Sequence, residues 1–261
     1  MRTFNSDFLW CALLLLSLIL LHISRRETKI VNLNNRIFRD IVVIGLLDVV
    51  FELASNGFIA RCADSICIGA VITTHVFFLF QALLPFSLLC YIRVLIENRR
   101  LSAREMLLMG APALSLAFII LTNPFTEILF YFDSTGYRHG PWYLLLYVSA
   151  LLHIAGAAVF VAVHRASVSR RTLTELLAVF ALAALGIAAQ AVNPSVLTTG
   201  FGLSLSILAM YLTINNPCAC MDSLTVDKLE GILAFANKAA SITTSRHGAI
   251  PAMPTLAEVE G

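Results

Sequence analysis

The chain has 261 residues, of which 59% are hydrophobic and 13% are charged, and its formal net charge is +2. A soluble globular domain has about 45–50% apolar and about 25% charged residues, so this composition indicates a membrane protein. The same composition argues against a disordered chain, a disulfide-rich secreted module and a nucleic-acid-binding protein.

Seven continuous apolar stretches approach the roughly 20 residues that a helix needs to cross a bilayer. In chain order they are residues 8–23, 37–58, 68–92, 106–121, 142–163, 173–192 and 196–214. We expect helices because backbone polar groups must be satisfied within the lipid, and the alternating pattern of a barrel is missing. We interpret the first stretch as a spanning helix rather than a signal peptide, since Arg25 and Arg26 follow its apolar core.

The positions of Lys and Arg predict the orientation, because cytoplasmic loops retain basic residues. With the N-terminus outside, fifteen of the 18 basic residues are cytoplasmic, and Arg2, Arg61 and Arg138 are outside. We therefore predict an all-α integral membrane protein with seven transmembrane helices, a cytoplasmic C-terminus and a multi-pass location in the plasma membrane. Residues 1–214 form the transmembrane domain, 215–243 a cytoplasmic juxtamembrane helix and 244–261 a disordered tail.

The predicted outer loop at residues 122–141 is unusually aromatic for a linker. Aromatic and polar residues alternate up to Asp133, and residues 133–136 (DSTG) have the composition of a turn. This pattern predicts a short strand that pairs with the segment after the turn. The alternative is an interfacial lid whose aromatic rings anchor at the lipid headgroups.

Several polar side chains fall within the predicted spans, where ionisable groups are costly and suggest a function. Asp48 and Glu52 share one face of the second span, the third carries His75 and Gln81, and the fifth carries His153. At about 1.5 Å per residue, Glu52 and His75 have similar depths below the outer surface, so we expect them to meet. They predict an outward-facing polar cavity, with His153 on its far wall. Such a cavity suits a cation, a small polar ligand or pH sensing, although hydrogen bonding between helices explains the same residues.

The first outer loop contains Cys62 and Cys67. This pair either closes a small disulfide loop in an oxidising exterior, or Cys67 simply begins the third helix. We find no metal-ligand set, Walker loop, H-E-x-x-H or G-x-S-x-G motif. We therefore expect no enzyme activity, no cofactor and no metal.

Two parts of the sequence together resemble a known family. They are the loop, with NPF at 123–125, FYFD at 130–133 and GYRHGP at 136–141, and the exit segment, with YLTINNP at 211–217 and DSLT at 222–225. These segments resemble the multi-spanning membrane input regions that precede bacterial GGDEF diguanylate cyclase domains. The chain contains no GG[DE]EF signature, so none of that family's nucleotide-binding or Mg²⁺-binding residues is carried over.

The resemblance implies a bacterial membrane sensor that detects an extracytoplasmic or intramembrane cue and relays it through the last helix. Its partners would be the lipid bilayer and a signalling protein with an output domain, in a homo- or hetero-oligomer, and not nucleic acid. The cue-binding candidates are Asp133, Tyr137, Arg138 and His139 of the loop, together with Asp48, Glu52, His75, Gln81 and His153. The alternative function is a small-molecule or ion transporter or channel.

Overall fold

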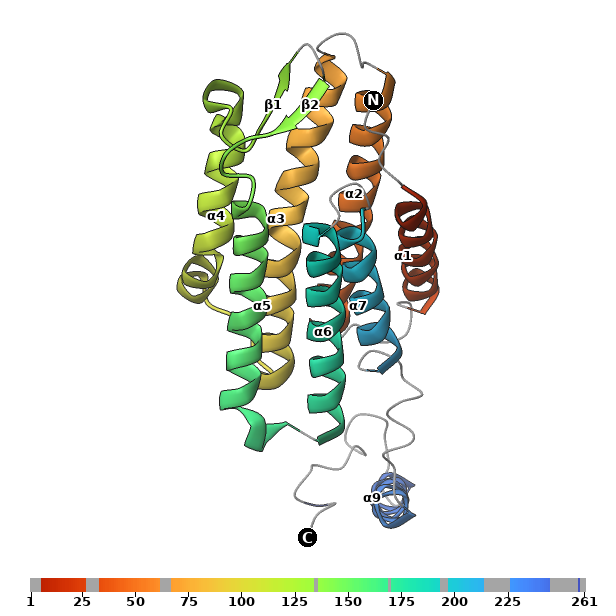
Figure 1. Cartoon of the computed structure of the whole chain (residues 1–261). Coiled ribbons are helices and arrows are strands. Elements are labelled where there is room, and N and C mark those ends of the chain that lie inside the picture. Colours follow the sequence, from red (N-terminus) through yellow and green to blue (C-terminus); the bar gives the residue numbers. More distant parts are fainter. Residues whose placement is uncertain are drawn as a thin grey trace. The chain divides into compact units, whose positions relative to one another are not determined.

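The computed structural model describes residues 6–26, 33–61, 67–133, 136–168, 170–192, 197–213, 226–244 and 258. The chain separates into two compact units, Met1–Ile214 and Asn215–Gly261 (Figure 1). The first unit contains, in order, α1 (Asp7–Arg26), α2 (Leu33–Arg61), α3 (Ile68–Glu97), α4 (Ala103–Thr126), β1 (Phe130–Asp133), β2 (Gly136–His139), α5 (Leu145–Val163), the 3₁₀ helix η1 (Arg165–Ser167), α6 (Arg170–Val192) and α7 (Thr199–Thr213).

The second unit contains α9 (Val226–Thr244), which overlaps the predicted juxtamembrane helix. The predicted disorder of residues 244–261 falls outside the described residues, apart from Thr244 and Glu258.

The helices α1 to α7 coincide with the seven predicted stretches. Among the described residues, α1, α3, α4, α5 and α6 are long and apolar enough to cross a membrane. Helix α7 is also apolar but has only 15 residues, fewer than the roughly 20 that span a bilayer without thinning. Helix α2 has 29 residues and contains two buried carboxyl groups, those of Asp48 and Glu52. The structure therefore supports an all-α membrane protein, while the seven-span topology and its orientation stay predictions.

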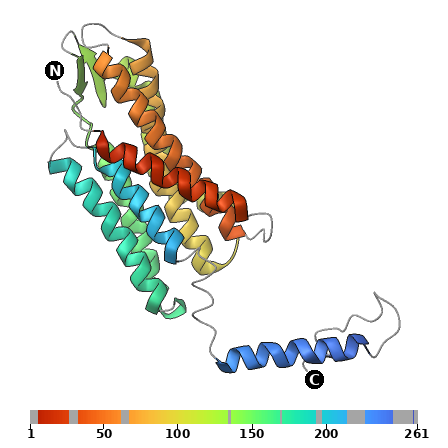
Figure 2. The same ribbon diagram turned by 90° about the vertical axis from the view of Figure 1, so that its right-hand side faces the viewer.

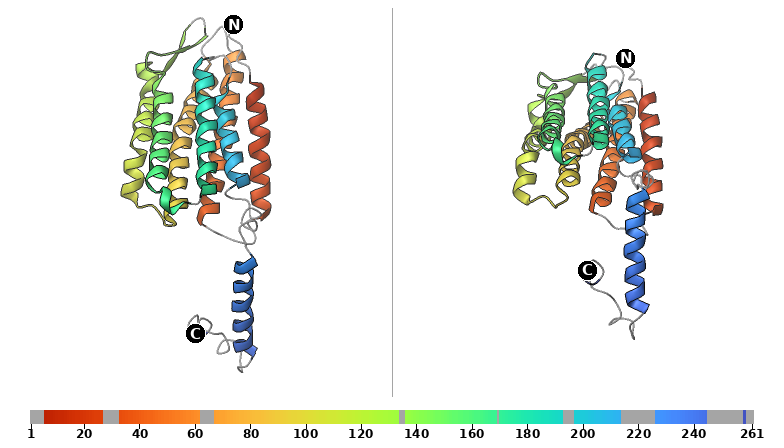
Figure 3. Two further views of the ribbon diagram at one scale, coloured as in Figure 1. Left: turned by 60° about the horizontal axis from the view of Figure 1, so that its bottom comes forward. Right: turned by 90° about the horizontal axis from the view of Figure 1, so that it is seen from below.

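The helices of the first unit form one bundle in which chain neighbours pack together. Helix α2 packs along α3, and α6 packs along α7. Helix α1 contacts α2 and α7, whereas α4 contacts α3 and α5, so α1 and α4 lie at opposite edges of the bundle (Figures 1 and 3).

The outward faces of these edge helices are apolar. Exposed large side chains recur every three or four residues, namely Trp10, Leu14, Leu18 and Leu21 on α1, and Leu114, Phe118, Leu121 and Phe125 on α4. A water-soluble bundle would place polar side chains there, because large exposed apolar patches are unfavourable in water. These faces are suited to contact with lipid.

The predicted β-hairpin is confirmed and covers one end of the bundle (Figure 2). Strands β1 and β2 are antiparallel, with Phe130 opposite His139 and Phe132 opposite Tyr137. The positive φ of Gly136, 107°, suits the turn because glycine lacks the Cβ that makes this conformation unfavourable.

Asn123, near the end of α4, fixes the hairpin to the bundle. Its Oδ1 accepts a hydrogen bond from the backbone N–H of Leu129 at 2.8 Å, and its Nδ2 donates to the carbonyl of Phe130 at 2.9 Å. The Phe130 ring is buried and packs 5.2 Å from the ring of Phe78 on α3. The hairpin is thus a packed part of the membrane unit and not a free loop.

The opposite end of the bundle contains a network of ion pairs. Arg93 pairs with Glu97 at 2.6 Å and with Glu105 at 3.1 Å, and Arg99 pairs with the same two carboxylates. Ser102 and Glu105 form a capping box at the start of α4. The ion pairs and the capping box together stabilise the short connection between α3 and α4.

Candidate functional site

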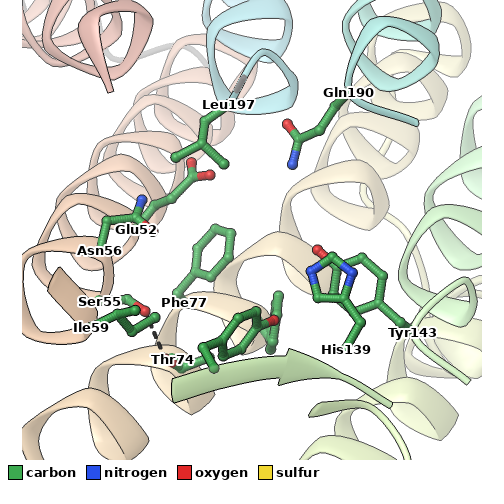
Figure 4. A pocket seen from close by; sticks show the side chains of 12 residues that line it. Glu52, Ser55, Asn56, Ile59, Thr74, Phe77, His139, Tyr143, Gln190 and Leu197 are labelled. Carbon is green, nitrogen blue, oxygen red and sulfur yellow. Dashed lines mark hydrogen bonds between the residues drawn. The ribbon is translucent and has the colours of Figure 1, made fainter. Parts of the chain in front are cut away.

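A polar cavity lies under the hairpin, between α2, α3, α6 and the start of α5. Its water-accessible volume is about 40 Å³, which holds about three waters at 10–15 Å³ each. It is lined by Glu52, Ser55, Asn56, Ile59, Thr74, Phe77, Phe78, Tyr137, His139, Tyr143, Gln190 and Leu197 (Figure 4).

Glu52 is the acidic group among the described residues that line the cavity. The sequence analysis had selected it as a candidate for the predicted polar cavity. Its side chain is 4% exposed, and its Oε2 has no hydrogen-bond partner among the described residues. No Lys or Arg is found among the described residues that line the cavity. An ionised carboxylate buried without a counter-ion is strongly unfavourable, so this site needs a proton or a cation from outside the protein.

The wall between α2 and α3 is formed by Thr74 and not by its neighbour His75. The hydroxyls of Ser55 and Thr74 lie 2.6 Å apart, which joins the two helices beside Glu52. His75 donates from Nδ1 to the carbonyl of Val71 at 2.7 Å, and its ring packs edge-on against Phe130 at 4.8 Å. Successive residues of a helix point about 100° apart, so depth alone could not decide which of the two side chains faces Glu52.

The hairpin divides the four loop candidates between its two faces. Tyr137 and His139 line the cavity, and the His139 ring stacks on Tyr143 with centroids 3.6 Å apart. Arg138 lies between them in sequence, on the other face, where its Nε pairs with Asp133 Oδ2 at 3.2 Å. This alternation follows from the period of two in a strand.

A hydrogen-bonded series of side chains leads from the hairpin to α7. Tyr143 bonds to both Tyr137 and Tyr147, and Tyr147 bonds to Gln190. Burial raises the pKa of the Tyr137 and Tyr143 phenols well above their ordinary value, so both are neutral donors at physiological pH.

Gln190 completes this series at the first turn of α7. Its Oε1 accepts from the backbone N–H groups of Thr198, at 3.0 Å, and Thr199, at 2.8 Å. These N–H groups lack partners within their own helix because they begin it. The same carboxamide therefore lines the cavity and caps α7.

The sequence analysis did not select Tyr143, Tyr147 or Gln190 as site residues. Neutral tyrosines are ordinary at helix ends near a membrane surface. Gln190 carried a usable signal, since it is a polar residue within the otherwise apolar stretch 176–192.

Besides His75, three further predicted cavity residues lie outside the lining. Asp48, 2% exposed, is one helical turn from Glu52, and its Oδ1 has no hydrogen-bond partner among the described side chains and backbone. His153 is equally buried and donates from Nδ1 to the carbonyl of Ser149 at 2.7 Å. Gln81 is partly buried on α3. None of the three contributes to the walls of this cavity.

The remaining predictions concern metals and the disulfide. In the described ranges, no group of three or more His, Cys, Asp and Glu side chains could hold a metal ion. Cys62 lies outside the described residues, so the predicted pair with Cys67 does as well.

Comparisons with protein-family models, curated proteins and solved structures found no match to this chain. The resemblance to GGDEF-associated input regions is therefore carried only by the quoted segments and stays a prediction.

Proposed function

We propose that the protein is a membrane sensor that binds its cue in the Glu52 cavity and passes the signal through α7. The observation that carries this proposal is the position of Gln190, which lines the cavity and caps the first turn of α7 at once. Helix α7 is the last helix of the membrane unit, which ends at Ile214.

A second contact couples the cavity to α7. A Cβ placed on Gly200 would lie 2.9 Å from Glu52 Oε2, so the carboxylate rests against the α7 backbone. A cue that attracts Glu52 into the cavity, or recruits the Gln190 carboxamide, alters the surroundings of α7 directly. The cue shifts α7 only if its affinity for the protein differs between two packed positions of this helix. Each tenfold difference in affinity shifts the equilibrium between these positions by about 1.4 kcal/mol.

The charge distribution supports a cavity that faces the outside of the cell. In the described part of the membrane unit, the end with the hairpin carries Arg61 and Arg138. The opposite end carries Arg25, Arg36, Arg39, Arg93, Arg99, Arg100, Arg104, Arg165 and Arg170, with Arg26 and Arg171 beside them. Basic residues favour the cytoplasmic side, so the hairpin and the cavity are assigned to the extracytoplasmic side.

The transporter alternative has less support. Transport sites commonly use helices that are interrupted near mid-membrane. Here α3 continues through Pro85, and α4 through Pro112, as single helices.

The relay is tested in the full chain with a diguanylate cyclase domain fused after Gly261. Gln190→Met removes the acceptor for the α7 N–H groups at similar side-chain size and is expected to change basal cyclase activity at least threefold. Gln81→Met is the matched control, because Gln81 does not line the cavity. Equal activities of the two variants at equal membrane expression would refute the relay through Gln190.

A further inference from the structure

We infer that the Glu52 cavity binds a ligand through a small primary ammonium group, with the Glu52 carboxylate as its counter-ion. This inference rests on the proposed function, because it names the chemistry of the cue for the same site. Three properties of the cavity carry it: its charge, the kind of groups in its walls, and its size.

The charge of the lining selects a cation. Among the described residues of the lining, Glu52 and His139 are the only ionisable groups apart from the tyrosines, and neither Lys nor Arg is present. An anion would be repelled by the Glu52 carboxylate, and a neutral ligand would leave Glu52 dependent on a bound proton for neutrality. A cationic ligand is the class that offsets the charge of Glu52.

The walls favour an organic ammonium over an inorganic ion. Phe77, Phe78, Tyr137 and Tyr143 contribute aromatic rings, and ring faces attract ammonium groups. An inorganic ion such as Ca²⁺ requires six to eight oxygen ligands, whereas Glu52 is the only carboxylate among the described residues of this lining. The described residues also provide no cluster of metal-binding side chains.

The size and the polar groups favour a primary ammonium. A volume of about 40 Å³ accepts about three heavy atoms, since a water-sized site takes 10–15 Å³. An ammonium group has three N–H donors. Glu52 Oε2 is an acceptor with no hydrogen-bond partner in the described part of the chain, and the Ser55 and Thr74 hydroxyls and the Asn56 side chain lie along the same wall. A trimethylated ammonium is larger and offers no donor to these oxygens.

The hairpin is the side through which a longer ligand would extend. Tyr137 and His139 are half-buried, in contrast to Glu52, Thr74 and Gln190 on the inner walls. Figure 4 shows Glu52 and Gln190 directed toward a common space, with His139 and Tyr143 on its far side. The ammonium group is accordingly placed inside, and the rest of the ligand toward the hairpin.

The test is isothermal titration calorimetry on the purified full chain in nanodiscs of neutral lipid. The probes are propylammonium, tetramethylammonium and sodium, each added as the chloride salt, and propanol, which is neutral and has a similar shape to propylammonium. The inference expects saturable binding of propylammonium, with at least tenfold weaker binding of the other three. No detectable binding of propylammonium, equal binding of propanol, or equal competition by sodium would each overturn it.

Two variants separate this site from non-specific attraction. Glu52→Gln keeps the shape of the side chain and is expected to weaken the binding of propylammonium at least tenfold. Asp48→Asn is the matched control, since it also neutralises a buried α2 carboxyl group but lies outside the lining. Equal affinities of the two variants overturn the assignment of Glu52, and the probe series on the unmodified chain decides the inference if Glu52→Gln fails to fold.

A last measurement distinguishes the two proposals. Propylammonium is added to the cyclase fusion described above, and cyclase activity is recorded. Binding together with a change in activity of at least twofold supports both proposals. Binding without a change leaves the ammonium site intact and overturns the relay, whereas an absence of binding overturns the ammonium site alone.

Discussion

Glu52 on α2 lies directly against Gly200 on α7, so closely that a Cβ on Gly200 would be 2.9 Å from Glu52 Oε2. This contact joins the buried acid to the last helix of the membrane unit. A hydrogen atom is the largest substituent that fits at position 200 while the carboxylate stays in place.

Gly200→Ala is therefore expected to displace the Glu52 carboxylate and weaken propylammonium binding about tenfold, or about 1.4 kcal/mol. Calorimetry measures the affinity, and thermal unfolding verifies that the bundle is intact. Gly57→Ala is the control, because a Cβ there meets nothing within 4 Å. Unchanged affinity in Gly200→Ala would show that the carboxylate is not constrained by α7.

Asn123 connects the hairpin to α4, and Asn123→Ala is expected to release it. The change leaves the Leu129 N–H and the Phe130 carbonyl without their partner. Each buried polar group left unpaired costs about 1–3 kcal/mol. The melting temperature in detergent should fall, and proteolysis within residues 134–135 should accelerate. Thr122→Val is the control, since the Thr122 hydroxyl bonds only within α4, to the Phe118 and Ile119 carbonyls. A melting temperature equal to that of the control would contradict this role of Asn123.

The α6–α7 contact depends on two facing glycines. A Cβ on Gly202 would lie 2.9 Å from Gly186 Cα, well inside the roughly 3.5–4.0 Å of a favourable carbon contact. Gly202→Ala should separate the helices and destabilise the unit by about 1–3 kcal/mol, as overpacking does. Thermal unfolding is compared with that of Gly156→Ala, where the nearest atom is an ordinary 3.9 Å away. Equal stabilities would mean that the two helices adjust freely.

High pH is expected to destabilise the hairpin end. Burial raises the pKa of Tyr137 and Tyr143 in the folded protein, whereas the unfolded phenols titrate near pH 10. Above about pH 10 the folded state thus binds more protons than the unfolded state, and the stability present below that pH is lost as pH rises. Absorbance at 295 nm should show late ionisation in the unmodified chain, and this late fraction should shrink in Tyr137→Phe. Titration of all tyrosines near pH 10 in the folded protein would contradict the burial.

The orientation is tested with reporter insertions. Alkaline phosphatase placed between residues 134 and 135 should be active because the hairpin faces outside, and a green fluorescent protein after Gly261 should be fluorescent. The charge asymmetry between the two ends of the bundle is the physical reason. An inactive phosphatase with normal expression would invert the topology and place the Glu52 cavity on the cytoplasmic side.

Local patterns in the sequence were sufficient for the helices and the hairpin. The apolar stretches correspond to α1 to α7, because lipid requires long runs of apolar side chains with satisfied backbone groups. The hairpin followed from alternation around a turn, and Glu52 stood out because a carboxyl group within an apolar stretch is costly. Each of these signals lies within about twenty consecutive residues.

Only the tertiary structure decided which polar groups share a cavity. Thr74 rather than His75 faces Glu52, and Tyr143 and Gln190 complete the walls from segments distant in sequence. These choices depend on the rotation of each helix about its axis, and that rotation is set by close packing such as that of Gly186 against Gly202. A hydropathy pattern records how apolar a helix is, but not which neighbour each of its side chains meets.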